Sequence, residues 1–353
     1  MAKPRFPYES LADLPGVAFA SMRQMILAQA AASKLEVLED AAARLTVATA
    51  HGLIGLRPGA KAETAGMVAA EDARTLFIMK NAVIQQMRMV MPEVAEAMRW
   101  SDGDTEGDLP ANFQFVRVRA VEDLGAVFLR VTLEGEDLTT YGDTSIHFRL
   151  VQPPKEAEPE WPTIAANGSI KWPYGPGAPH KPVYTTRAVD HAANTLITDV
   201  FIHQGGRTTD WAREAQQGVR GRSVVGLVGP SGGGLLNSEK VFMATDETGF
   251  PAAARLLENL PKGATGEILL ESEEGAACDY PITAPEGIQM HWLARSRGEK
   301  LVEAVQEQMP SHADADIWFA GEKRDARHLR EVAKAGGWDG SKLRISGFWS
   351  APE

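Results

Sequence analysis

The chain has 353 residues, of which 44% are hydrophobic and 24% charged. These values are typical of a globular protein and exclude a disordered chain, a coiled coil and a collagen-like repeat. The net charge of −11 makes a phosphate backbone an unfavourable partner, so we expect no binding to nucleic acid. A chain of this length predicts two or three domains.

The single cysteine, Cys278, excludes an internal disulfide and any zinc ribbon or iron–sulfur cluster held by this chain alone. No apolar run approaches the roughly 18 residues that span a bilayer. The start of the chain carries no secretory signal. We therefore expect a cytoplasmic protein with no membrane insertion. We also expect no metal site, since His312, Asp314 and Asp316 form only a solvated acidic loop.

The first hundred residues are rich in alanine and methionine and contain one clear helical pattern. Apolar side chains recur at helical spacing over 71–91, and its methionines are interpreted as a packed core face. Two strands are predicted before it, Leu45–Leu56 and Lys61–Ala69. The acidic run 101–108 is expected to be a flexible linker. Residues 1–105 are therefore predicted to form a small α+β domain.

The middle of the chain follows the period of two that is typical of strands. Six short strands, interrupted by a Pro- and Gly-rich excursion over Gln152–Pro182, predict an antiparallel β-barrel at 110–225. The strands are expected at Phe113–Ala120, Val127–Glu134, Ser145–Val151, Val183–Val189, Asn194–His203 and Arg222–Val228.

From residue 223 onward, apolar strands alternate with helices. This alternation predicts a parallel sheet with helices on its faces, so we expect an α/β domain at 226–353. Strands are expected at Val241–Ala244, Gly266–Leu270, Ile288–Leu293, Ile317–Ala320 and Leu343–Phe348, and helices at Pro251–Leu260, Leu301–Met309 and Asp325–Ala335.

Two candidate cofactor motifs lie in the predicted barrel. Tyr184 and Thr185 could flank a flavin ring, although both also suit an ordinary strand. Further on, a strand ends at His203 and opens into a Gly-rich turn. Thr208, Thr209 or Asp210 could cap the following helix, whose N–H groups would then face an anion.

A third motif, Asp246-Glu247-Thr248, follows a strand and precedes a helix, which is the usual arrangement of a nucleotide phosphate site. The fourth, Gly229–Gly233, matches G-x-S-x-G. A serine hydrolase needs a helix directly after that serine, so we interpret this segment as a hinge between the barrel and the α/β domain.

The identity of the nucleotide stays open at this stage. Glu271, Glu273 and Glu274 could bind a ribose diol and favour NADH. Arg295 and Arg297 could instead hold the 2′-phosphate of NADPH, and all of these residues also suit a plain charged surface.

Taken in order, these motifs resemble the siderophore-interacting protein family of FAD-dependent ferric-siderophore reductases. The resemblance spans about residues 112–350 and includes Gly229-Pro230, Ala320-Gly321-Glu322 and the closing Ser346–Trp349. It implies a ferredoxin-reductase-like protein, with a six-stranded FAD-binding barrel followed by an NAD(P)H-binding α/β domain. Residues 20–100 resemble a small domain of unassigned function that is often fused ahead of this family.

The resemblance also implies which residues bind the cofactors. Phe348 and Trp349 would lie near the flavin, and Asp246, Glu247 and Thr248 near the nicotinamide nucleotide. FAD would be held by Tyr184, Thr185, Arg187, Asp199, Val200, Phe201, His203, Thr208, Thr209 and Trp211.

The sequence departs from the family pattern at two places. Pro182 stands where the family usually has an arginine that contacts a flavin phosphate, with Lys181 beside it. The usual Tyr-Trp-Arg ending is here Phe348-Trp349-Ser350, which removes a hydroxyl and a charge near the flavin.

The function implied is reduction of a ferric siderophore or other ferric chelate by NAD(P)H through FAD. Lys171, Lys181 and Lys240 are candidate cations for the chelate. The alternatives are a flavin or electron-transfer reductase serving a partner such as ferredoxin, and a non-catalytic module that binds a ferric chelate. The N-terminal domain could be a lid, a dimer surface or a chelate-recognition element.

Overall fold

The computed structural model describes residues 6–103 and 106–351. The start of the chain, Met1–Arg5, and two residues of the expected linker, Asp104 and Thr105, lie outside them. The chain divides into two compact units: Met1–Phe113 with Pro154–Pro179, and Gln114–Pro153 with His180–Glu353. Within the described residues, no helix is both long and apolar enough to cross a bilayer.

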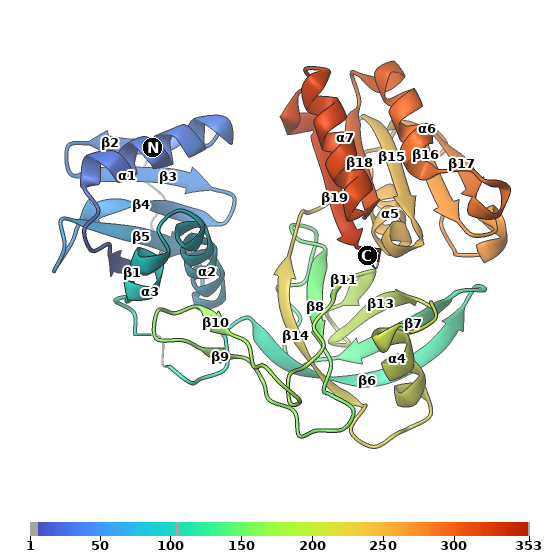
Figure 1. The fold of residues 1–353 in the computed structure, drawn as a ribbon, viewed down its shortest axis with the longest axis horizontal. Helices are drawn as coiled ribbons and strands as arrows, with labels where there is room; N and C mark the ends of the chain where they lie inside the picture. The colour runs from blue at the N-terminus through green and yellow to red at the C-terminus, as the bar shows by residue number, and fades with distance from the viewer. Residues whose placement is uncertain (1–5, 104–105, 352–353) are drawn as a thin grey trace. The chain divides into compact units, whose positions relative to one another are not determined.

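The first unit contains a five-stranded antiparallel sheet in the order β1-β5-β4-β3-β2, together with three helices (Figure 1). Its core unites apolar residues of the sheet, such as Val47 and Val68, with Met22 of the first helix and Met79 of the second. The elements are β1 (Tyr8–Asp13), α1 (Phe19–Ala32), β2 (Val37–Ala41), β3 (Arg44–Thr49), β4 (Gly52–Pro58), β5 (Thr64–Ala70), α2 (Ala73–Val90) and α3 (Pro92–Ala97).

Helix α2 ends close to where its sequence pattern ends. The carboxylate of Asp72 accepts a hydrogen bond from Thr75 N at 2.8 Å and so caps the first turn. Pro92 cannot continue the backbone ladder and instead opens α3 as its first residue. The methionines on the inner face of α2 pack in the core, as expected.

Two expectations for this unit are wrong. Leu45–Leu56 is not one strand but the hairpin β3–β4, which turns at Ala50-His51. The acidic run is also not uniformly flexible. Asp102 forms an ion pair at 2.7 Å with Lys80, whose side chain is 1% exposed, and accepts a hydrogen bond from Ser10. A buried ammonium needs this carboxylate, so the pair anchors the chain after α3.

Most of the Pro- and Gly-rich excursion, Pro154–Pro179, belongs to the first unit. It carries a short hairpin, β9 (Thr163–Ile164) and β10 (Ile170–Lys171). Asn167 donates to the carbonyl of Ala95 at 3.0 Å, and Asn81 donates to that of Gly168 at 3.2 Å. The excursion thus leaves the barrel strands and packs on α2 and α3. The contiguous boundaries 1–105, 110–225 and 226–353 stay a prediction.

The barrel of the second unit is antiparallel and has the predicted six strands. The strand after the excursion forms two halves, β11 and β12, because it changes its pairing partner midway. Thr186 N bonds Ile146 O beside β8, and Arg187 N bonds Ile197 O in β13. This switch closes the sheet, because each half pairs with a different edge. The elements are β6 (Phe113–Leu124), β7 (Phe128–Glu134), β8 (His147–Val151), β11 (Val183–Thr185), β12 (Ala188–Asp190), β13 (Thr195–Phe201), α4 (Arg207–Gln216) and β14 (Val224–Ser231).

The α/β part follows, with a parallel five-stranded sheet in the order β17-β16-β15-β18-β19. The order reverses between β15 and β18, so their carboxyl ends form the switch point where nucleotides bind in such sheets (Figure 1). The elements are β15 (Lys240–Asp246), α5 (Phe250–Glu258), β16 (Thr265–Ser272), β17 (Ile288–Ala294), α6 (Leu301–Gln308), β18 (Asp316–Glu322), α7 (Lys323–Ala335) and β19 (Leu343–Trp349).

Candidate functional site

A pocket of about 590 Å³ lies where the barrel meets the carboxyl ends of the parallel strands. We call it the barrel pocket. Its volume is typical of sites for drug-sized ligands and cofactors. The barrel lines it with Phe128, His147, Arg149, Pro182, Val183, Tyr184, Thr185, Asp199, Phe201 and His203, and the α/β part with Glu247, Thr248, Pro251, Lys323, Ser346, Gly347, Phe348 and Trp349.

Strand pairing explains why these residues meet. In register, β11 places Tyr184 opposite Phe148 and Thr185 opposite His147, on β8. The His147 and Phe348 rings meet edge to face, with centroids 5.4 Å apart. The barrel thus presents aromatic and hydroxyl groups to the end of β19.

Burial keeps two polar groups of this wall, Tyr184 and His147, neutral. Burial raises the pKa of Tyr184 to about 12 and lowers the pKa of His147 to about 4. Near pH 7 the phenol and the imidazole are therefore uncharged groups that can donate or accept hydrogen bonds. Such a wall suits a large, mostly uncharged ring system.

Gly232 has a positive φ of 77°, and a Cβ on it would lie 2.6 Å from the His147 ring. A glycine at this position lets the chain after β14 pass close to that ring. Ser231 ends β14, and no helix begins there, so the hydrolase arrangement is absent from this described segment.

Helix α4 begins two residues earlier than a cap at Thr208, the first of the expected capping residues, would require. Its N-cap is Gly206, which has no side chain to cap the first turn, and Thr208 and Thr209 lie inside that turn. Nearby, Thr208 contacts the Gln152 amide oxygen at 3.5 Å, while Gln152 Nε2 is buried with no partner among the described residues. Uncapped helix N–H groups beside an unsatisfied amide fit an anion such as a pyrophosphate.

Asp199 lines the barrel pocket, but its carboxylate already has partners. Arg130 donates to both of its oxygens at 2.8 Å, and the Tyr280 hydroxyl donates at 2.7 Å. Asp199 has a 2% exposed surface, so these bonds balance a buried charge. Since Arg130 is a barrel residue and Tyr280 an α/β residue, Asp199 ties the two parts together.

Five of the residues expected at FAD do not line the barrel pocket: Thr208 and Thr209 in the first turn of α4, and Arg187, Val200 and Trp211. Arg187 pairs with Glu258 through two contacts, at 2.8 and 2.5 Å. Val200 and Trp211 are buried in the barrel core, where Trp211 donates to the carbonyl of Arg222 at 3.2 Å. The alternation of a strand turns Val200 inward, because its neighbours Asp199 and Phe201 face the pocket.

The turn after β15 places a carboxyl group at the switch point. Asp246 accepts hydrogen bonds from Thr248 N at 2.9 Å and from Trp349 Nε1 at 2.6 Å. Burial raises the pKa of Asp246 to about 6, although these hydrogen bonds act against the shift. Asp246 therefore links the turn to the end of β19.

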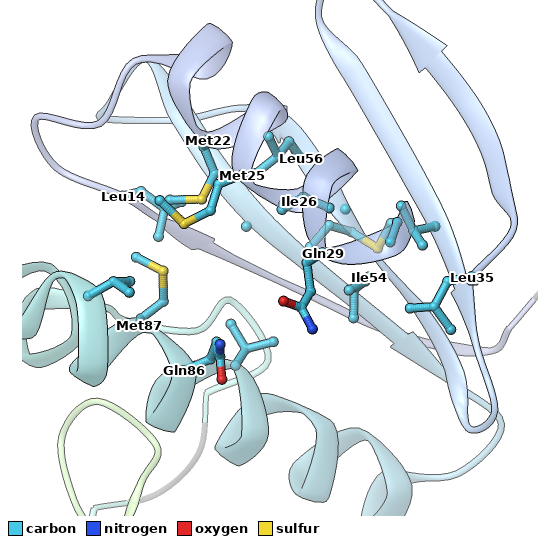
Figure 2. A pocket seen from close by; sticks show the side chains of 17 residues that line it. Leu14, Met22, Met25, Ile26, Gln29, Leu35, Ile54, Leu56, Gln86 and Met87 are labelled. Atoms are coloured by element: carbon cyan, nitrogen blue, oxygen red, sulfur yellow. The ribbon is translucent and has the colours of Figure 1, made fainter. Parts of the chain in front are cut away.

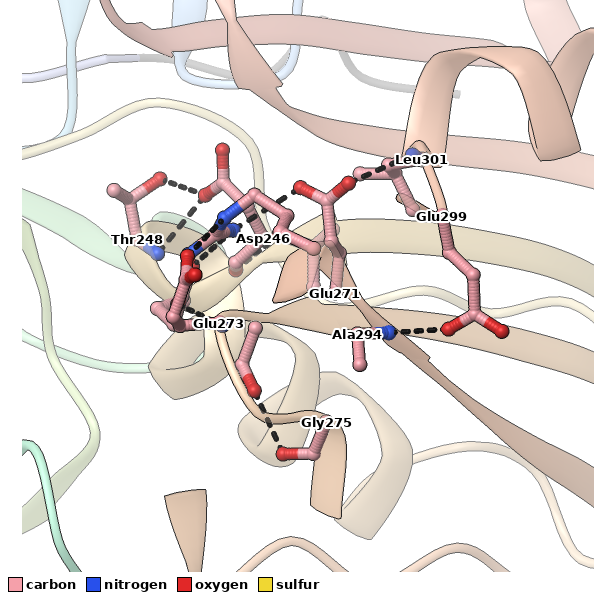
Figure 3. Close-up of polar contacts among 12 residues, drawn as sticks. Asp246, Thr248, Glu271, Glu273, Gly275, Ala294, Glu299 and Leu301 are labelled. Carbon is pink, nitrogen blue, oxygen red and sulfur yellow. Dashed lines mark hydrogen bonds and ion pairs between the residues drawn. The ribbon is translucent and has the colours of Figure 1, made fainter. Parts of the chain in front are cut away.

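A second pocket, of about 480 Å³, lies at the carboxyl ends of β15, β16 and β18. There Arg295 contacts Glu247 at 2.5 and 2.9 Å, Glu271 at 3.1 Å and Glu273 at 3.3 Å. Figure 3 shows Asp246 and Glu271 in this region, with Glu271 also accepting from the amide of Leu301 at 2.8 Å. We call Arg295 and its three glutamates the Arg295 cluster.

The remaining candidate cations are scattered. Arg297 lies outside the Arg295 cluster and pairs with Glu299 at 2.9 Å. Lys240 is the first residue of β15, at the opposite end of the strand from Asp246, and forms an ion pair with Asp314. Lys171 lies on β10 of the first unit, and Lys181 adjoins Pro182 at the barrel pocket.

The residues of this region that sequence reasoning missed include His147, Arg149, Lys323 and Tyr280. His147 and Arg149 lie on a predicted strand, but only its register beside Tyr184 reveals that they matter. Among the described residues, no group of three or more His, Cys, Asp or Glu side chains is placed to hold a metal ion.

Comparison with known proteins agrees with this architecture. The family model described as "Siderophore-interacting FAD-binding domain" matches residues 117–234, and the one described as "Siderophore-interacting protein" matches residues 238–352. The siderophore-interacting protein SipS of Aeromonas hydrophila has a similar fold, with a TM-score of 0.53 and 20% identity over 69% of this chain and 93% of that one. A siderophore utilization protein from T. fusca gives a TM-score of 0.54 at 24% identity, over 68% and 94%.

Curated relatives are similar over the same region. An NADPH-dependent ferric-chelate reductase of Escherichia coli (strain K12) is 30% identical over 246 residues, covering 68% of this chain and 93% of that protein. A ferric vibriobactin reductase of Vibrio cholerae is 29% identical over 244 residues, covering 65% and 85%. The chain therefore belongs to the siderophore-interacting protein family and is a flavoprotein oxidoreductase with an FAD-binding barrel.

Proposed function

We propose that this protein uses FAD and NAD(P)H to reduce the Fe(III) of a ferric siderophore or other ferric chelate. The observation that carries the proposal is the barrel pocket, where a neutral aromatic and hydroxyl wall meets the nucleotide end of the parallel sheet. The family relatives named above, which reduce ferric chelates and ferric vibriobactin, support the choice of substrate.

The residues of the pocket fit FAD. Tyr184, Thr185 and His147 offer hydrogen bonds to the polar edge of the flavin ring, and Phe201 and His203 offer ring faces. The uncapped start of α4, where exposed Arg207 is the first helical residue, suits the pyrophosphate. When bound, FAD accepts a hydride and can pass electrons on singly, as reduction of Fe(III) requires.

Two aromatic residues complete the wall of the pocket on the α/β side. Phe348 and Trp349 lie on the pocket wall, and Trp349 is held by its hydrogen bond to Asp246. NAD(P)H would approach from the switch point, past Asp246, Glu247 and Thr248. Arg149 and Lys323 are exposed cations on the rim and suit an anionic chelate.

The proposal includes a cytoplasmic location, where NAD(P)H is available and the unpaired Cys278 stays reduced. It leaves the N-terminal unit outside the electron path.

A spectral titration tests the proposal. The purified protein is reconstituted with FAD, whose absorption near about 450 nm is followed without oxygen. NADH or NADPH is expected to bleach the band, and a ferric chelate is expected to restore it. Recovery with ferredoxin but with no ferric chelate would replace the proposal by an electron-transfer reductase. Failure to take up FAD would leave only a binding module.

Two barrel threonines form a matched pair for this experiment. Thr185 is 5% exposed and lines the pocket, whereas Thr198 is fully buried and faces away from it. We expect Thr185→Val to weaken FAD binding by roughly tenfold, the value of one lost hydrogen bond, and Thr198→Val to leave it unchanged. Equal effects of both variants would contradict the assignment of Thr185.

A further inference from the structure

The first unit contains an apolar cavity of about 160 Å³ between α1, α2 and the sheet. Figure 2 shows Met22 and Ile26 reaching into it from α1, Met87 from α2, and Ile54 and Leu56 from β4. It lies in a part of the chain that neither matching family model covers, since these begin at residue 117.

Gly66 shows that this space is not filled by the protein. It sits in the middle of β5, every residue of which is buried, and it is paired with Ala12 on one side and Leu56 on the other. Directly paired residues share a face of the sheet, and Leu56 lines the cavity. A Cβ on Gly66 would meet only the carbonyl oxygen of Ala12, at 4.0 Å.

No backbone requirement explains this glycine. A Cβ on Gly55, which also lines the cavity, would lie 2.1 Å from the carbonyl oxygen of Leu45, so that glycine is needed for close packing. Gly66 has neither such a contact nor a positive φ. Glycine weakens a strand interior and often marks a place where a ligand comes close.

The lining defines the chemistry of the occupant. It includes no ionisable side chain, and its only polar side chains are those of Gln29 and Gln86, both exposed at the opening. Methionines such as Met22 and Met87 adapt to irregular apolar shapes. An engineered apolar cavity of about 150 Å³ in another protein stays dry and takes up benzene, so a cavity of this volume suits a ligand of about that size.

We propose that this cavity binds a small uncharged apolar molecule, of about the size of one aromatic ring, with any single polar group lying at Gln29 and Gln86. The site is separate from the barrel pocket and does not depend on the redox function. It gives the N-terminal unit a binding role that can be measured without FAD.

The test is an NMR titration of the full chain, labelled at the methionine methyl groups, with toluene and with indole. Both probes are expected to shift the signals of Met22 and Met87, and to leave that of Met89, which is 81% exposed, unmoved. Sodium octanoate at neutral pH is expected to bind more weakly than either, because a carboxylate would have to approach an apolar lining.

Gly66→Leu fills the cavity. It is expected to weaken toluene binding by roughly tenfold or more while raising the melting temperature, because a side chain then occupies the empty volume. Met89→Leu is the matched control and should bind like the wild type. If Gly66→Leu does not fold, Val83→Phe on α2 narrows the same cavity from the opposite wall.

The proposal fails if saturating toluene and indole shift no signal, or if Gly66→Leu folds and binds them like the wild type. It also fails if the Met22 and Met87 signals move on dilution alone, since a second copy of the chain would then cover the opening.

Discussion

Asp246 is a buried carboxyl group in the turn after β15, and its burial makes the stability of the protein depend on pH. Burial raises its pKa from 3.8 to about 6. A group whose pKa is raised on folding contributes stability that is complete below its unfolded pKa and is lost as the pH rises through its folded pKa. For Asp246 this loss falls between about pH 4 and pH 6.

The expected result is measured with Asp246→Asn, which cannot ionise. The difference in unfolding free energy between variant and wild type should shift in favour of the variant, by up to about 3 kcal/mol, between pH 4 and pH 7.5. Any hydrogen bonds that the variant loses lower its unfolding free energy equally at both pH values, so they do not affect the shift. Denaturant unfolding at the two pH values gives the difference, and a constant difference would show that Asp246 does not titrate there.

The Arg295 cluster bears on the choice of nucleotide. Burial disfavours the charge of Arg295, but the hydrogen bonds that it donates to Glu247 and Glu271 outweigh this and raise its pKa. With Glu273 added, three carboxylates surround one guanidinium, and the cluster keeps a negative charge. Such a site repels a 2′-phosphate, while a free carboxylate oxygen can accept from a ribose diol.

We therefore expect NADH to give a higher kcat/KM than NADPH in flavin reduction. Glu273→Gln should shift the NADH-to-NADPH ratio toward NADPH by roughly threefold to tenfold, because it removes one exposed charge beside Arg295. Glu286→Gln removes an exposed charge before the start of β17, away from the carboxyl ends of the strands, and serves as the control. A ratio that favours NADPH in the wild type would overturn this assignment of the cluster.

At the scale of elements, side-chain hydrogen bonds and ion pairs decide where segments lie that show no helix or strand period in the sequence. The run after α3 looks like a solvated linker in sequence, since it is acidic and Gly-rich. Its carboxylate Asp102 nonetheless reaches buried Lys80 on α2. The composition of the linker does not show that Lys80, on a predicted helix, is buried and needs an anionic partner.

Asp102→Ala should destabilise the first unit by about 1.5–3 kcal/mol, because it removes a charged hydrogen-bond partner of the buried Lys80 ammonium. The double variant Lys80→Met with Asp102→Ala should recover most of that loss, since methionine is apolar and similar in length. Urea unfolding followed by circular dichroism measures both. Equal stability of wild type and Asp102→Ala would show that the pair contributes little.

At the scale of the whole molecule, the chain forms two compact units, each with its own hydrophobic core. One core comprises residues between Ala12 and Trp100, and the other clusters lie within Gln114–Pro153 and His180–Glu353. The excursion Pro154–Pro179 leaves the barrel and rejoins the first unit through Asn81 and Asn167.

Calorimetry should consequently resolve two transitions. FAD binds the second unit, so FAD at a hundredfold excess over its Kd should stabilise that transition by about 2.7 kcal/mol and leave the other unmoved. Asp102→Ala should lower only the transition that FAD does not affect. A single transition that FAD and Asp102→Ala both shift would show that the two units unfold together.

The sequence by itself determined the strands and helices of the barrel and the α/β part, because their period-two runs, β–α alternation and turn residues are local signals. It also pointed to part of the barrel pocket, since Tyr184, Thr185, Phe201 and His203 belong to short motifs. It predicted Val183–Val189 as one strand but could not show that this strand changes partners at Thr186, because pairing depends on register. Only the tertiary structure showed that Val200 and Trp211 are buried in the barrel core. It also showed that Asp199 accepts hydrogen bonds from Arg130 and Tyr280, and that the space beside Gly66 is empty. Each of these depends on contacts between residues far apart in the chain, which no local pattern encodes.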